Sequence, residues 1–371
     1  MADPVGRLMK IRSGLSPAEW ARGGAMAVTV IGLNVLGWGM VAAAAGRHIH
    51  LTHKDVYGFG TGILAYTLGM RHAFDADHIA AIDNTTRKLV GDGKKPLSVG
   101  FFFSLGHSSV VFVLGGLLLF GIKDLDDQVR NGSSHLQYTT NIVGTVVSGV
   151  FLLLIAALNI AILRNILKIF REMRAGAYDD RALEEQLAKR GIMNRLLGRF
   201  ARNVDTPWKM YPIGFLFGLG FDTATEVALL LLTGAAAVVG GLPWYAVLAL
   251  PILFAAGMSL FDTMDGAYMN YAYNWAFARP VRKIYYNITI TGLSVFVALF
   301  IGAVELLGLL AQDASLGGSG WKWLESFNIN TAGFVIVGVF VLTWVIALSV
   351  WHFGKLEQRW DLSGAKVAAN D

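Results

Sequence analysis

The stretch GMRHAFDADHI, residues 69–79, places one arginine, two histidines and two aspartates close together in a long apolar segment. A lone ionised side chain at the centre of a membrane helix costs about 2.5–3.5 kcal/mol on insertion scales. Imidazole and carboxylate groups are also side chains that bind protons and divalent metal ions. The cluster therefore indicates a polar site with a purpose beyond packing.

Helical geometry divides the four histidine and aspartate side chains of this stretch into two groups. On an ideal helix His72, Asp75 and His78 line one side, whereas Asp77 points nearly the opposite way. This arrangement fits a set of metal ligands on one face, with Asp77 turned towards another partner. If the helix is instead unwound near Gly69, the ideal wheel does not apply.

Three further polar clusters lie in other apolar segments of the chain. They are FFFSLGHSSVV (101–111) with His107, LGFDTATE (219–226) with Asp222 and Glu226, and GMSLFDTMDG (257–266) with Asp262 and Asp265. Asp222 and Glu226 are four residues apart, so on a helix they share a face and repel each other unless a proton or a cation bridges them.

Each cluster also has a purely structural interpretation. Arg71 and Asp75 can form a buried ion pair, His107 can be a packing histidine, and the serines and threonines can join neighbouring helices. Taken together, however, six buried carboxylates face a single buried arginine. This excess of negative charge calls for a cation.

The ligand types narrow the choice of cation. The chain has no cysteine, so thiolate ligands and disulfides are excluded. Carboxylates alone would suit Mg²⁺ or Ca²⁺. Imidazole combined with carboxylate, without thiolate, favours the borderline ions Ni²⁺, Co²⁺, Zn²⁺ and Mn²⁺.

The elements that must position these residues are membrane-spanning helices. Of the 371 residues, 54% are hydrophobic and only 15% are charged, whereas a soluble domain carries about 25% charged residues. Apolar runs long enough to cross a bilayer recur along the chain. We predict an all-α polytopic membrane protein with eight spans, at 24–45, 56–84, 97–122, 140–167, 209–239, 242–264, 284–311 and 329–353.

The loop charges predict the orientation of these spans. With the N-terminus inside, the inner segments hold 25 of the 31 Lys and Arg residues and the outer loops hold five, with Arg71 inside a span. Both termini are therefore expected in the cytoplasm, and the net charge of +5 reports orientation, not nucleic-acid binding. The predicted parts are an N-terminal segment (1–23), a first half (24–167), a cytoplasmic loop (168–208), a second half (209–353) and a cytoplasmic tail (354–371).

The direction of the polar spans favours transport over storage. Spans 2 and 5 are expected to run in opposite directions, both contain glycine, and FDAD in one resembles FDTA in the other. Such pairs point to a site at the membrane midplane between inverted repeats. Two alternatives stay open: an intramembrane metal-dependent hydrolase, although HExxH is absent, and a metal-binding subunit that needs an ATPase partner.

At these four motifs the sequence resembles the nickel/cobalt transporter (NiCoT) permeases over about residues 20–355. RHAFDADHI (71–79) is the most distinctive of them. The resemblance implies uptake of Ni²⁺ or Co²⁺ across the bacterial cytoplasmic membrane by a single chain that is not an enzyme. It implies no cofactor, with the metal as substrate, no nucleic-acid partner and no obligatory ATPase subunit.

The resemblance also assigns roles to residues. Metal recognition falls on His72, Asp75, Asp77 and His78, and the other motifs add, with roles less defined, His107, Asp222, Glu226, Asp262 and Asp265. Our hypothesis is alternating access, with imidazole nitrogen from the two histidines of 71–79 and a histidine oriented by Asp77 or Asp222. The chain has no GxxxxGK[ST] loop, so the membrane potential or proton exchange is the expected energy source.

Overall fold

The computed structural model describes nine stretches of the chain: 16–46, 56–120, 135–174, 204–220, 224–238, 242–276, 280–314, 318–325 and 329–353. Within them, every regular element except one 3₁₀ turn is an α-helix. The order is α2 (Pro17–Ala45), α3 (Phe59–His72), α4 (Ala76–Gly91), α5 (Val99–Leu119), α7 (His135–Arg174), η1 (Pro207–Lys209), α11 (Met210–Gly218), α12 (Ala224–Val238), α13 (Trp244–Ala276), α14 (Pro280–Asp313), α15 (Ser319–Glu325) and α16 (Ile329–Phe353).

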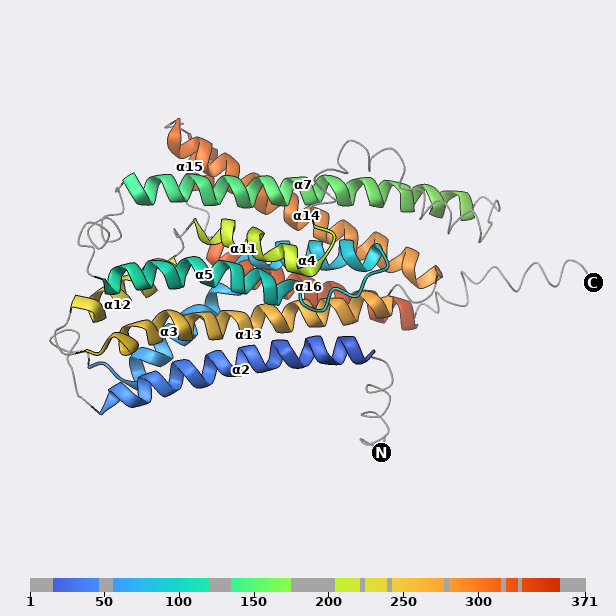
Figure 1. Cartoon of the computed structure of the whole chain (residues 1–371). Helices are drawn as coiled ribbons and strands as arrows, with labels where there is room; N and C mark the ends of the chain where they lie inside the picture. Colours follow the sequence, from blue (N-terminus) through green and yellow to red (C-terminus); the bar gives the residue numbers. More distant parts are fainter. Residues whose placement is uncertain are drawn as a thin grey trace, which may run out of the picture.

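The long helices lie side by side along one axis, and the start of α2 and the end of α16 lie at the same end of the bundle (Figure 1). Six helices of the described part are long and apolar enough to cross a membrane. These segments are Pro17–Ala45, Val99–Leu119, Asn141–Ala161, Trp244–Ala276, Ile288–Asp313 and Ala332–Phe353. The expectation of a helical, multi-pass membrane protein is confirmed.

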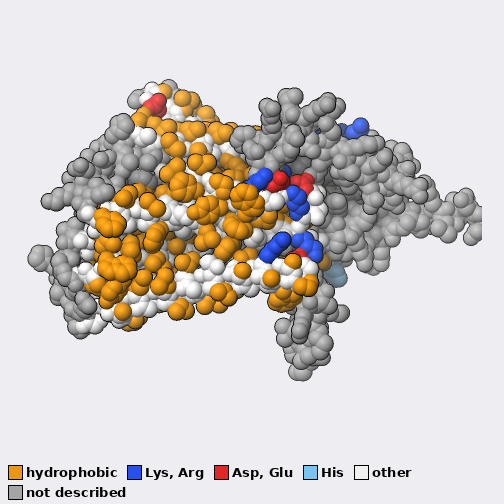
Figure 2. Space-filling view, in the orientation of Figure 1, with side chains coloured by type: hydrophobic (Ala, Val, Ile, Leu, Met, Phe, Trp, Pro, Cys, Tyr) orange, Lys and Arg blue, Asp and Glu red, His pale blue; other side chains and the backbone are white. Residues whose placement is uncertain are grey.

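The outer surface is that of a protein surrounded by lipid. Large apolar side chains such as Val28 (72% exposed) and Phe296 (65%) face outwards, which a water-soluble monomer avoids over such an area. Figure 2 shows apolar side chains spread over this face, with the charged side chains of the described residues gathered mostly near the end at which α2 begins. The ion pair Lys95–Glu19, at 3.1 Å, involves the first turn of α2.

Two of the eight predicted spans are not continuous helices. The predicted span 56–84 is divided into α3 and α4 by three residues, and 209–239 is divided into α11 and α12. Asp75 precedes α4 with an extended backbone (φ −68°, ψ 145°) and makes no side-chain capping bond, although Asp is a favoured residue at this position. The alternative that the helix unwinds near Gly69 is wrong about the position, because α3 continues to His72 and the break follows it.

Other boundaries also shift. α13 extends twelve residues beyond the predicted end at 264, so Asp262 and Asp265 lie within a helix and not at its end. The predicted cytoplasmic loop 168–208 begins as a continuation of α7, and most of it lies outside the described residues. α16 has the bounds predicted for the last span.

Glycines bring four helix backbones into contact at the centre of the bundle. On α3 and α13, a Cβ added at Gly69 would fall on the Phe254 carbonyl, and one at Gly257 would fall on the Tyr66 carbonyl. The same close approach joins α5 and α11. There, Gly106 abuts the Tyr211 carbonyl and Gly214 abuts the Phe103 carbonyl. Small residues allow such approaches between membrane helices, and the polar clusters lie next to them.

Candidate metal-binding site

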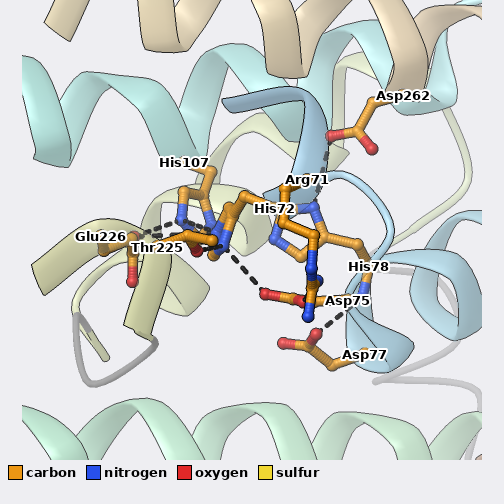
Figure 3. A network of polar contacts seen from close by, with 9 residues as sticks. All are labelled: Arg71, His72, Asp75, Asp77, His78, His107, Thr225, Glu226 and Asp262. Atoms are coloured by element: carbon orange, nitrogen blue, oxygen red, sulfur yellow. Dashed lines mark hydrogen bonds and ion pairs between the residues drawn. The ribbon is translucent and has the colours of Figure 1, made fainter. Parts of the chain in front are cut away.

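Three histidines from three helices meet inside the bundle. His72 ends α3, His78 lies in the first turn of α4, and His107 lies in the middle of α5. Their ring centroids are 4.7 to 4.8 Å apart, and each ring offers a nitrogen within 4.8 Å of the other two. All three are buried, with exposed fractions of 1%, 0% and 3%. Figure 3 shows the rings grouped around the break between α3 and α4.

A carboxylate from α12 completes one side of this group. Glu226 Oε1 lies 2.7 Å from His107 Nε2 and 3.8 Å from His72 Nε2. The two Nε2 atoms are themselves 2.9 Å apart. Thr225 Oγ1 lies 3.0 Å from His72 Nδ1 and turns the other side of that ring towards His107. Two imidazoles and a carboxylate therefore present three possible ligand atoms to one point.

The third histidine is oriented from α13. His78 Nδ1 lies 3.3 Å from Asp262 Oδ2, and because a carboxylate accepts, this contact places the proton on Nδ1. His78 Nε2 then carries the lone pair. It is buried and has no hydrogen-bond partner among the residues that the structure describes. A histidine whose other nitrogen donates to a carboxylate is the usual arrangement of a metal ligand.

Arg71 and Asp75 form the remaining side of the cluster. Arg71 Nη1 donates to Asp75 Oδ1 at 2.8 Å. Asp75 Oδ2 lies 3.0 Å from His72 Nδ1. Asp75 is buried, whereas the Arg71 side chain keeps 28% of its surface exposed. The arginine therefore balances a carboxylate that also supplies negative charge beside His72.

Aromatic rings close the site against water. Phe103 meets the His78 ring edge-on with centroids 4.8 Å apart, and Phe254 lies 5.5 Å from the His72 ring. Both rings are buried. In such a low-dielectric pocket, charges act on each other more strongly than in water.

The structure brings together most of the residues that the sequence singled out, but not all. His72, Asp75, His78, His107, Glu226 and Asp262 form the network of Figure 3. Asp77 stands at its edge, where its Oδ1 accepts from the His78 backbone N–H at 2.9 Å. Asp265 interacts electrostatically with Asp83 and Asp262, and within the described residues it makes no hydrogen bond to the histidines. Asp222 lies outside the described residues.

A second buried polar network, which the sequence patterns do not predict, lies on α4 across the predicted end of the second span at residue 84. Asp83 accepts from Tyr273 of α13 and, at 2.6 Å, from Ser294 of α14. Asn84 Oδ1 accepts from Arg87 at 2.8 Å and from Asn159 of α7 at 2.7 Å. The i,i+4 spacing of Asp83 and Arg87 was the available signal. This network joins α4 to three long helices and extends the buried polar region beyond the histidines.

Comparison with known proteins gives a consistent result. The family model described as NicO, High-affinity nickel-transport protein, matches residues 58–350. The chain is 55% identical to "Nickel transporter NicT" of Mycobacterium tuberculosis over 95% of both chains. It is 46% identical to "Nickel transporter NixA" of Staphylococcus aureus, over 89% of this chain and 94% of that protein. No solved structure matches.

A further relative is named for a different metal ion. The chain is 45% identical to "Cobalt transport protein NhlF" of Rhodococcus rhodochrous, over 79% of this chain and 83% of that protein. The family and its relatives are transport proteins, which confirms the expectation that the chain is not an enzyme. The buried histidines, the apolar helices and these matches agree: the chain belongs to the family of high-affinity nickel-transport proteins.

Proposed function

We propose that this chain is a secondary transporter that takes up Ni²⁺ or Co²⁺ by alternating access. The ion is bound between His72, His78 and His107. The observation that carries the proposal is the convergence of three buried imidazoles inside a helical membrane protein. Glu226 supplies charge as a further ligand, and Asp75 and Asp262 orient the histidines. Asp77, Asp222 and Asp265 stay predictions as participants in the site.

The distances around His107 support an ion at this point. Separations of 2.9, 2.7 and 3.8 Å place His72 Nε2, His107 Nε2 and Glu226 Oε1 on a circle of about 1.9 Å radius, so a point about 2.0–2.1 Å from all three exists. That is the usual length of a bond from a divalent transition ion to imidazole or carboxylate. At this bond length the two imidazoles would subtend an angle of about 90° at the ion, as in square or octahedral coordination.

Mixed imidazole and carboxylate ligands suit both candidate ions. Two of the relatives named above are described as nickel transporters and one as a cobalt transport protein. Ligand type alone does not separate nickel from cobalt, because geometry usually decides selectivity among these ions. We therefore assign both as substrates of this chain.

Metal binding at this site is coupled to protons. His107 Nε2 lies 2.7 Å from Glu226 Oε1 and 2.9 Å from His72 Nε2, and a hydrogen bond at either distance requires a proton on one of the two atoms. A metal ion at the same point must replace it, because only unprotonated imidazole binds metal. This exchange supports the proton gradient or the membrane potential as energy source, with no ATPase subunit.

For the membrane arrangement we propose eight crossings, in which α3 with α4 and α11 with α12 each make one. The reciprocal glycine contacts support an inverted repeat, because Tyr66 and Gly69 have the same spacing as Tyr211 and Gly214. Discontinuous helices at a midplane site are typical of such transporters. The Lys and Arg distribution supports a cytoplasmic location of both termini, and we propose the bacterial inner membrane as the location.

The test is metal accumulation by purified protein in liposomes, with the chain alone and a proton gradient imposed. His72→Ala and His107→Ala should abolish uptake of both ions and weaken Ni²⁺ binding measured by calorimetry. His352→Ala is the control, because His352 is exposed in the last turn of α16. Undiminished uptake by both site variants would remove the proposal. Uptake by the wild-type chain only after an ATPase is added would favour the accessory-subunit alternative.

A further inference from the structure

Among the side chains that the structure describes, helix α16 supplies none to the histidine network, yet the helix contacts the break between α3 and α4. Gly333 is buried, and a Cβ added to it would fall on the Phe74 carbonyl and within 3.2 Å of the Ala76 nitrogen. The backbone of α16 therefore rests directly on the non-helical turn that separates His72 from His78. A contact this close fixes the position of the turn.

The next residue of α16 holds the same turn through its ring. The Phe334 ring stacks on the Phe74 ring, with centroids 5.4 Å apart and an angle of 20° between the ring planes. The Arg71 guanidinium lies 4.8 Å from the centroid of the same Phe334 ring. This cation–π contact stabilises the positive charge of Arg71, whose side chain is 28% exposed.

From Phe334 an unbroken series of contacts leads to the candidate ligand. Arg71 lies on the Phe334 ring and donates to Asp75 at 2.8 Å. Asp75 lies 3.0 Å from Nδ1 of His72. A displaced arginine would leave this carboxylate unbalanced and free to rotate away from the imidazole. Phe334 thus acts on His72 through two charged side chains.

We propose that Gly333 and Phe334 are positioning residues for the metal site, and that α16 holds the α3–α4 break in its metal-binding conformation. This inference rests on the proposed function, because it assumes that His72 and His78 bind the transported ion. It assigns to the last helix a role in metal affinity that its apolar sequence does not indicate. The expected consequence is a change of affinity that exceeds any change in the amount of folded protein.

Gly333→Ala tests the backbone contact, and Gly338→Ala is its control. Both glycines lie on α16, but a Cβ at Gly338 meets nothing within 4 Å. We expect Gly333→Ala to raise the dissociation constant for Ni²⁺ by about tenfold or more and to raise the KM of uptake in liposomes. Gly338→Ala should leave both unchanged. Equal affinities of the two folded variants would overturn the role of Gly333.

Phe334 offers a series that stays informative if Gly333→Ala fails to fold. Its side chain is 49% exposed, so substitutions there leave the core intact. Phe334→Leu keeps apolar volume but loses the cation–π contact, and should raise KM by about two- to tenfold. Phe334→Trp keeps a ring for Arg71 and should restore wild-type KM. Val335→Ala, at a neighbouring position that is 61% exposed, is the control.

A double variant distinguishes a positioning role of Phe334 from a general destabilisation of the protein. If Phe334 acts through Asp75, then Phe334→Leu should weaken Ni²⁺ binding in the wild-type background and add nothing to Asp75→Asn. Additive losses, or the same KM for the Leu and Trp variants, would overturn the proposal. His72→Ala, measured beside them, separates the two levels. If the His72→Ala variant binds and transports Ni²⁺ normally, the proposed function itself fails. If His72→Ala abolishes Ni²⁺ binding but the Phe334 variants bind Ni²⁺ like the wild-type chain, only the positioning role is refuted.

Discussion

Asp262→Asn is the substitution that tests most directly how the site is organised. Asp262 Oδ2 lies 3.3 Å from Nδ1 of His78, and both side chains are buried. Asparagine keeps the shape and an acceptor oxygen but removes the charge that favours the Nδ1–H tautomer and makes Nε2 a better ligand. Loss of such a partner typically costs 10- to 100-fold in metal affinity.

The geometry sets where in that range the effect should fall. Because 3.3 Å is a long contact for a charged pair and asparagine retains an acceptor, we expect about tenfold weaker Ni²⁺ binding, equivalent to about 1.4 kcal/mol. Calorimetric titration of the purified protein measures it, with thermal unfolding as the check on folding. The Vmax and KM of uptake in liposomes show whether transport follows affinity.

Asp313→Asn is the matched control for this experiment, because it makes the same change of side chain away from the histidines. Asp313 is exposed at the end of α14 and accepts a hydrogen bond from the Tyr138 hydroxyl at 2.6 Å. We expect its substitution to change the dissociation constant by less than about threefold. Unchanged affinity in a folded Asp262→Asn variant, or an equal loss in both variants, would refute the reasoning that Asp262 acts through His78.

Three more predictions concern packing and stability. Gly100→Ala should destabilise the protein by about 1–3 kcal/mol, because its Cβ would meet the Asp262 carbonyl; Gly116→Ala, with open space at the same helix, should not lower the melting temperature. Tyr273→Phe removes one of two hydroxyls that donate to a buried aspartate of α4, and should cost about 1–3 kcal/mol without changing nickel affinity. The hydrogen bond from the Lys209 ammonium holds the pKa of Asp205 below its ordinary value of 3.8, so its contribution is complete above that value and disappears as the pH falls below it. Asp205→Asn should therefore lower the melting temperature slightly at about pH 7, and its difference from the wild-type chain should shrink as the pH falls below the ordinary pKa of 3.8.

The sequence predicted the helices well where one helix faces lipid along its whole length. α16 has the predicted bounds because its residues are almost all apolar between polar ends. Hydropathy failed where the polar residues are buried. Residues 83–88 have exposed fractions of 9% or less, yet their composition is that of a loop, because α7, α13 and α14 supply the partners that a single segment cannot show.

Most residues of the candidate site could be predicted from residue type, but their geometry could not. From the sequence alone, a single histidine such as His107 can be a packing residue. In the structure, α3 and α4 bring two further histidines beside it. Asp77 was placed opposite the ligands by an ideal wheel, but the break resets the helical phase after His72. Nothing in residues 73–75 is a strong helix breaker. The contact with Gly333 on α16 is a tertiary feature that supports the turn, and no local pattern contains it.

That break is what makes a shared site possible. In a continuous helix, His72 and His78 would be separated by about 9 Å along the axis, since each residue adds about 1.5 Å. Their ring centroids are instead 4.7 Å apart, because the chain turns between α3 and α4. Binding of one ion by both rings, as we propose, therefore requires the break. A change of backbone conformation at residues 73–75 would separate these two proposed ligands while α5 kept His107 in place, and so would give the proposed transporter a local means of releasing its ion.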